Sequence, residues 1–167
     1  MYCAQYLILL IPNTEAMNIE LYNSDFLNFV ELNYTGDNDE YRRCDPESKY
    51  IDTEVFNLFL ECFENANKLF DYFLGTKYNS RKIIVLRNEL FRNLEELEKI
   101  SALQDFVKMA ESRFMGKDFL QELDAMQPSW QDNWKGYLEK LITVNRELIA
   151  FTEKCADEER VLWVVGY

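Results

Sequence analysis

Apolar residues recur with a helical period over most of the second half of the chain. Between 130 and 155 they fall on one face of a helix, because successive apolar positions are three or four residues apart. The stretch from Ser80 to Gly116 has the same period, but its apolar stripe changes direction at Ser101. We therefore expect a long helix over 130–155, two helices separated by a break at Ser101, and a short piece around 118–126.

The apolar positions between 53 and 74 cover about half of a helical circumference, which is more than a surface helix needs. Asp52 or Thr53 offers a cap at the start, and Gly75 follows the end. We therefore expect one central helix over 53–74, packed by neighbours on two sides. The apolar members of this arc are Val55, Phe56, Phe59, Leu60, Cys62, Phe63, Ala66, Leu69, Phe70, Phe73 and Leu74.

Strand patterns are confined to short stretches near the two ends. The apolar run 6–11 and the run 161–165 both read as buried strands, and we expect them to pair with each other. The alternation at 17–21 suggests another short strand, and 26–34 fits either a helix or a strand. The expected fold is mainly α (α+β): a single α-rich domain over 1–167, built as a compact bundle of about four helices with a small β element formed by the chain termini.

Charge separates the chain into unequal halves. The net charge is −12, and residues 1–79 contain 14 acidic against 5 basic side chains, a balance of −9. Such a negative potential repels phosphate backbones and anionic membranes and attracts basic surfaces. We therefore expect a basic protein partner, and no direct contact with nucleic acid or membrane.

The residue composition argues against several kinds of catalytic and metal site. The chain has no histidine, which excludes the commonest general base and the commonest metal ligand. Its four cysteines show no CxxC spacing and are typical of free thiols in a reducing cytosol, with Cys62 and Cys155 on apolar stripes. No phosphate-binding glycine loop or other catalytic motif occurs. We expect a cytoplasmic protein that is not an enzyme and binds no cofactor.

The stretch 33–50 is the strongest candidate for a contact region. Asp37 and Asp39 have the spacing of two calcium ligands, but Arg42 and Ser48 occupy the positions where a calcium loop needs glycine and glutamate, so we expect no metal here. Tyrosines among carboxylates favour protein docking, although an ordinary solvated loop has the same composition. The predicted partner-binding residues are Tyr34, Asp37, Asp39, Glu40, Tyr41, Asp45, Glu47 and Tyr50.

Two ExxE pairs, Glu61 with Glu64 and Glu95 with Glu98, keep an enzyme among the alternatives. Helical metal-dependent hydrolases hold Mg²⁺ with carboxylates on adjoining turns. Glu61 and Glu64 lie roughly opposite the apolar arc, which favours a solvated face over a metal site.

Asn145 is a polar residue inside the apolar stripe of the long helix. A buried amide must find hydrogen-bond partners, so Asn145 either fixes the packing of that helix or lines a pocket. A bond to a neighbouring backbone group is the simplest expectation.

The leading hypothesis is a non-enzymatic inhibitory protein that occludes a basic partner. An immunity protein or antitoxin against a nuclease-like toxin and a phage-type nucleic-acid mimic are both of this kind. The hypothesis requires the carboxylates upstream of Gly75 to form a continuous exposed patch. The alternatives are a self-associating helical scaffold or regulatory subunit, possible as a homodimer, and the metal-dependent carboxylate enzyme.

Overall fold

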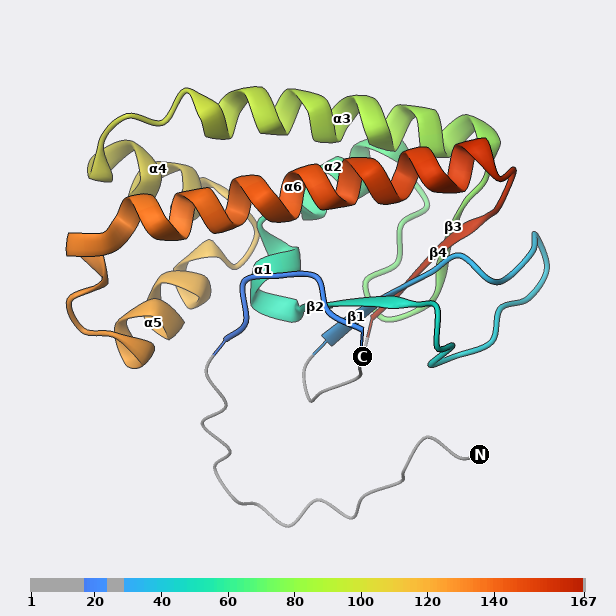
Figure 1. Cartoon of the computed structure of the whole chain (residues 1–167), viewed down its shortest axis with the longest axis horizontal. Coiled ribbons are helices and arrows are strands. Elements are labelled where there is room, and N and C mark those ends of the chain that lie inside the picture. Colours follow the sequence, from blue (N-terminus) through green and yellow to red (C-terminus); the bar gives the residue numbers. More distant parts are fainter. Residues whose placement is uncertain (1–16, 24–28, 167) are drawn as a thin grey trace, which may run out of the picture.

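The structure is a computed structural model that describes residues 17–23 and 29–166. Its strands are β1 (Phe29–Asn33), β2 (Lys49–Asp52), β3 (Thr76–Tyr78) and β4 (Leu162–Val165). Its helices are α1 (Thr53–Asn57), α2 (Leu60–Ala66), α3 (Ser80–Glu98), α4 (Leu103–Ser112), α5 (Gly116–Met126) and α6 (Trp134–Asp157), with the 3₁₀ turn η1 (Trp130–Asn133) before α6. The long helices α3 and α6 run side by side above the sheet, while α4 and α5 gather at one end (Figure 1).

The sheet is antiparallel, with strand order β2-β1-β4-β3. In β1, Val30 lies opposite Ile51 of β2, and Leu32 lies opposite Val164 of β4. All five residues of β1 are buried, including Glu31, which lies between these two apolar positions and so points to the opposite face. Both faces of this strand are therefore covered.

The two long helices share a buried seam that contains one polar pair. Asn145 of α6 is fully buried, and its Oδ1 accepts a hydrogen bond from Nδ2 of Asn93 on α3 at 2.7 Å. Its own Nδ2 donates to the carbonyl oxygen of Leu90 at 2.9 Å. The predicted bond to a neighbouring backbone group is confirmed at the Leu90 carbonyl, and the Asn93 side chain adds a second partner that was not predicted.

The predicted helical bundle with a small terminal β element is wrong. The chain is an α+β fold in which a four-stranded antiparallel sheet is built mostly from interior segments. Residues 6–11 lie outside the described residues, and both edges of β4 are occupied by β1 and β3. Residues 17–23 form no strand, and an isolated bridge joins Tyr22 to Tyr50.

The single helix predicted over 53–74 is also wrong. The chain forms α1 and α2 with a break between them, and the backbone leaves the helix at Asn67, whose φ and ψ are extended. The Asn67 side chain accepts the Leu69 N–H and donates to the Lys77 carbonyl, so it offers the backbone an alternative to the helix. Residues 67–75 therefore form a loop.

The other helix predictions are confirmed. The break at Ser101 separates α3 from α4, α5 occupies the short piece, and η1 with α6 covers the long helix. The run 161–165 contains β4, and 26–34 contains β1. Ala102 directly precedes α4, and no side chain caps this helix.

Candidate docking surface

The residues between β1 and β2, 34–48, form the acidic loop. Its first residue, Tyr34, packs against Phe151 of α6, while buried Glu31 holds the later part of the loop on the opposite face of the sheet. The Glu31 carboxylate accepts the Ser48 hydroxyl at 2.7 Å and the Cys44 backbone N–H at 3.1 Å. The indole N–H of Trp163 on β4 donates to the Asp37 carbonyl at 2.8 Å. The loop is thus fixed at its base and near its tip.

The predicted contact residues divide by burial. Tyr34 and Tyr50 are only 5% and 3% exposed, so they belong to the core and offer almost no contact area. Tyr41 and Asp45 are half-buried. Four carboxylates stay exposed: those of Asp37, Asp39, Glu40 and Glu47.

The exposed carboxylates at the loop tip have different local roles. The Asp37 carboxylate accepts the backbone N–H groups of Glu40 and Asp39 at 3.0 and 2.7 Å, and these bonds lower the pKa of Asp37 below its ordinary value. Asp37 therefore shapes the turn. Among the described residues, no ion pair involves Asp39 or Glu40, which leaves both free to meet an external cation.

Basic side chains border the loop both at its base and at its tip. Lys154 of α6 donates to the Tyr34 hydroxyl at 2.9 Å, and that hydroxyl lies 3.1 Å from a Glu47 carboxylate oxygen. Lys77 of β3 donates to the Asn38 carbonyl at 2.5 Å. The expected continuous acidic patch is therefore wrong. Glu31 is buried, Lys154 lies at the loop base, and Lys77 lies beside the tip, where Asp39 and Glu40 stay exposed.

A second exposed feature was missed by the sequence reading. We call it the apolar platform, and it combines residues of the 67–75 loop with the linker between α4 and α5. The exposed fractions are 81% for Leu69 and Phe73, 63% for Leu74, 51% for Phe114 and 49% for Met115. Exposure of this extent for five large apolar residues marks an interaction site more often than chance scatter does.

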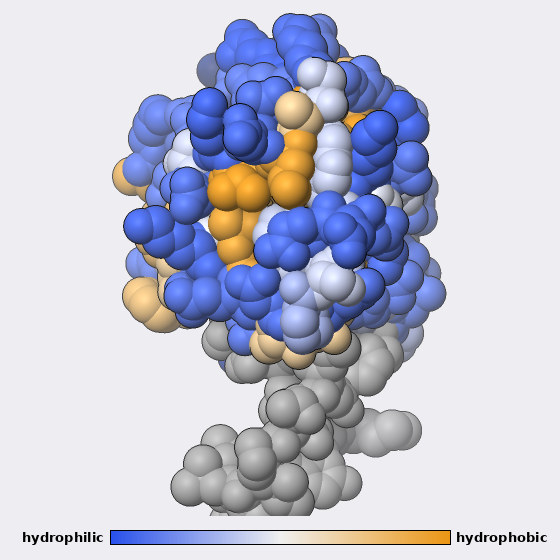
Figure 2. All heavy atoms as spheres, turned by 90° about the vertical axis from the view of Figure 1, so that its left-hand side faces the viewer, coloured by the Kyte–Doolittle hydropathy of each residue, from blue (hydrophilic) through white to orange (hydrophobic). Residues whose placement is uncertain are grey.

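Other apolar surface of the molecule is better covered. Figure 2 shows the end formed by α4, α5 and the start of α6, where an apolar strip is closely bordered by hydrophilic side chains. Apolar residues of α4 such as Leu103 and Val107 are only partly exposed and pack against the core. The platform differs because Leu69 and Phe73 keep most of their surface in water.

Tyr72 joins the two segments of the platform. Its ring centroid lies 5.3 Å from that of Phe73 and 5.6 Å from that of Phe114, and both contacts are edge-on. The Tyr72 hydroxyl donates to Asn57 at 2.8 Å, and the Asn57 amide lies 3.8 Å from the Met115 sulfur. These contacts order the platform from beneath.

The backbone of the 67–75 loop is held internally. The Asp71 carboxylate accepts the N–H groups of Phe73 and Leu74 at 2.9 and 3.1 Å, and the Asp71 N–H donates to the Thr76 hydroxyl at 2.9 Å. At Gly166 any side chain would clash, since a Cβ would lie 2.2 Å from the Tyr72 carbonyl oxygen. The loop therefore crosses the end of β4 in close contact.

Tyr41 connects the acidic loop to the platform. Its ring lies 4.8 Å from the Trp163 ring, and a Cβ at Gly75 would lie 2.7 Å from the Tyr41 hydroxyl. Because Gly75 directly follows Leu74, the acidic loop borders the platform at this point.

A second acidic group borders the platform on its other side. Burial raises the pKa of Glu54 on α1, and the negative charges of Asp52, Glu122 and Asp118 raise it further. Glu54 also acts on Tyr72. Burial and the Glu54 charge raise the pKa of Tyr72, whereas its hydrogen bond to Asn57 lowers it. Carboxylates therefore flank the platform on two sides.

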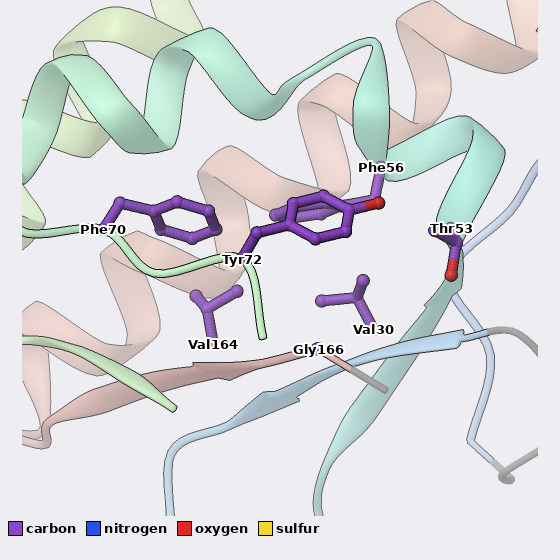
Figure 3. A pocket seen from close by; sticks show the side chains of 7 residues that line it. All are labelled: Val30, Thr53, Phe56, Phe70, Tyr72, Val164 and Gly166. Carbon is purple, nitrogen blue, oxygen red and sulfur yellow. The ribbon is translucent and has the colours of Figure 1, made fainter. Parts of the chain in front are cut away.

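A small pocket lies beside Tyr72, where α1, the 67–75 loop and the sheet meet. Figure 3 shows the rings of Phe56, Phe70 and Tyr72 above Val30 and Val164 of the sheet. Its cavity volume is about 10 Å³, which is room for about one water molecule. The pocket is therefore too small for a metabolite or for a side chain of a partner.

The ExxE carboxylates do not converge on a common point. Glu61 pairs with Arg113 at 2.8 Å, as does Glu96, while Glu98 pairs with Arg146 at 2.8 Å. Within residues 17–23 and 29–166, no group of three or more acidic or cysteine side chains is arranged to hold a metal ion.

The described cysteines are all free thiols. Burial raises the pKa of Cys62 and of Cys155 to about 12, so neither is a ready nucleophile. No helix in the described ranges is both long and apolar enough to cross a bilayer. The chain matches no family model, no curated protein and no solved structure.

Proposed function

We propose that this protein is a non-enzymatic, acidic binding protein that occludes a basic partner protein, in the manner of an immunity protein, an antitoxin or a nucleic-acid-mimicking inhibitor. Because the continuous acidic patch is absent, the proposal rests on a narrower observation. Asp39 and Glu40 are exposed, form no ion pair with any described residue, and lie on a loop that is fixed to the sheet. Charges held in place attract a cationic surface without an ordering cost, and they accelerate association. The buried free thiols Cys62 and Cys155 support action in a reducing cytosol.

The test isolates the partner protein and then measures how its binding changes when the charges of Asp39 and Glu40 are reversed. The immobilised wild-type protein captures its partner from a native lysate, and the purified partner is then titrated at about 50 and about 300 mM salt. Asp39→Lys with Glu40→Lys should weaken binding by about tenfold or more at low salt and flatten the salt dependence.

A matched control separates local from global electrostatics. Glu95→Lys with Glu147→Lys makes the same change in net charge on exposed helical positions away from the loop. This control should retain most of the affinity. Binding that does not change with salt, or an equal loss in both double variants, would contradict the proposal.

Self-association is the second candidate, because Phe73 and Leu69 are 81% exposed. A net charge of −12 opposes contact between two copies, so we rank this candidate below a basic partner. Light scattering distinguishes them, since a scaffold would form a stable homodimer with little affinity for basic proteins.

A further inference from the structure

The platform combines large apolar side chains with an ordered backbone. Leu69 and Phe73 extend into solvent from a loop that the Asp71 carboxylate caps internally and that Tyr72 ties to α1. Phe114 and Met115 come from a linker that the Arg113 guanidinium holds against Glu61 and Glu96. Ordered, exposed aromatic and sulfur-containing side chains are typical of surfaces that receive an apolar face of another protein.

Carboxylates border this surface in two directions. Glu54 with Asp118 and Glu122 lies on the side of α1 and α5. The tip of the acidic loop lies beyond Gly75 and Tyr41, where Lys77 offsets part of its charge. The start of the 67–75 loop is bordered by a cation instead, because Lys82 bonds the Asn67 side chain at 2.8 Å. A complementary partner must therefore present an apolar stripe with cations along both of its borders. An amphipathic basic helix has this pattern, because side chains on both flanks of its apolar stripe project sideways.

We propose that the apolar platform binds an amphipathic basic helix of the partner protein. The inference rests on the proposed function and specifies which element of the partner is recognised. A second copy of this chain is the less suitable occupant, because it would bring the same carboxylates against each other.

The probe is a labelled synthetic peptide of about 18 residues, five helical turns, made of leucine and lysine. Its leucines follow the i, i+3, i+4, i+7 pattern, and a second peptide of identical composition has leucine and lysine in strict alternation. Fluorescence anisotropy with the full chain should show binding of the first peptide that is at least about tenfold tighter than binding of the second.

The decisive variant is Leu69→Ser with Phe73→Ser, which should weaken binding of the helical peptide by at least about tenfold. Its matched control is Ile84→Ser with Phe91→Ser on α3, where the side chains are 47% and 43% exposed, and this control should bind like the wild type. Phe114→Ser with Met115→Ser tests the platform independently from its other segment. Unchanged circular dichroism and melting temperature exclude loss of fold as the cause.

The outcomes distinguish this inference from the proposed function. Equal binding by wild type and both platform variants, or equal binding of the two peptides, overturns the helix proposal. A wild-type homodimer that the platform variant abolishes, without peptide binding, also overturns it in favour of a second copy. If charge reversal at Asp39 and Glu40 abolishes partner binding while the platform variants retain it, the proposed function stands and only the platform proposal fails.

Discussion

Polar and apolar side chains are buried in the seam between α3 and α6 but exposed on the face formed by the acidic loop and the platform. We call this second region the docking face. In the seam, Asn145 accepts a hydrogen bond from Asn93 and donates one to the Leu90 carbonyl, and apolar residues are buried. On the docking face, Phe73 is largely exposed, and Asp39 has no ion pair in the described part of the chain. Groups in the seam are therefore satisfied by the fold itself, whereas those of the docking face stay in contact with water.

This difference has an energetic consequence. Substitutions in the seam remove interactions that the folded state depends on, and they should lower stability without a direct effect on binding. Substitutions on the docking face should affect binding while changing stability little, or even improving it. The following variants test this division from the largest expected effect to the smallest.

Asn145→Leu should be the most destabilising of the three. The substitution leaves the Asn93 amide and the Leu90 carbonyl in the seam without their buried partner. Loss of such a partner lowers the free energy of unfolding by about 2–3 kcal/mol, measured by urea denaturation. Asn88→Leu, at an exposed position of α3, is the control and should stay within about 0.5 kcal/mol of the wild type. Equal effects at both positions would show that the seam does not need its polar pair.

Arg113→Met should have an intermediate effect and link the two regions. The Arg113 side chain is 11% exposed and bonds Glu61, Glu96 and Asn93, each at 2.8 Å. Because both glutamates are 62% exposed and can regain water, we expect a loss of about 1–2 kcal/mol in urea denaturation.

Arg146→Met is the matched control, since its pair with Glu98 is exposed at 61% and 45%. It should lose less than about 0.5 kcal/mol. Arg113→Met should also weaken binding of the helical peptide, because Arg113 positions Phe114. Intact peptide binding in Arg113→Met would separate the two regions completely.

Glu54→Gln should have the smallest effect, and in the stabilising direction. The pKa of Glu54 is raised above its ordinary value of 4.5 by burial and by neighbouring carboxylates, so the folded state binds this proton more tightly than the unfolded state. The contribution of Glu54 to stability therefore falls as pH rises from 4.5 through the raised pKa.

At neutral pH Glu54→Gln should raise the melting temperature by about 1 °C, and the gain should disappear below about pH 4. Glu64→Gln on the exposed face of α2 is the control, and differential scanning calorimetry across this pH range is the measurement. A constant gain at all pH values would show that the Glu54 charge is not its source.

Helix positions were largely predictable from the sequence, whereas the sheet was not. The stripes of α3 and α6 repeat over many turns, so the local period alone identifies their buried faces. The strands are three to five residues long, as in β3 (Thr76–Tyr78), and such short stretches carry no period of their own. Their pairing depends on segments distant in the chain.

The candidate site was predictable only in part. The acidic loop follows from its composition, and Asp39 and Glu40 are exposed as the hypothesis requires. Tyr34 and Tyr50 were placed at its edges but are buried. Leu69 and Phe73 were assigned to a buried helical arc, and the signal that argues against that assignment is Asn67, a residue that competes with helical hydrogen bonds.

The sequence by itself determined the faces of the long helices, the acidic balance and the absence of histidine chemistry, because these depend on neighbours a few residues apart or on composition alone. Only the tertiary structure decided that Glu31 is buried under the acidic loop and that Phe73 is exposed beside it. A side chain is covered or left in water according to which remote segment packs on it, and periodicity carries no information about that segment.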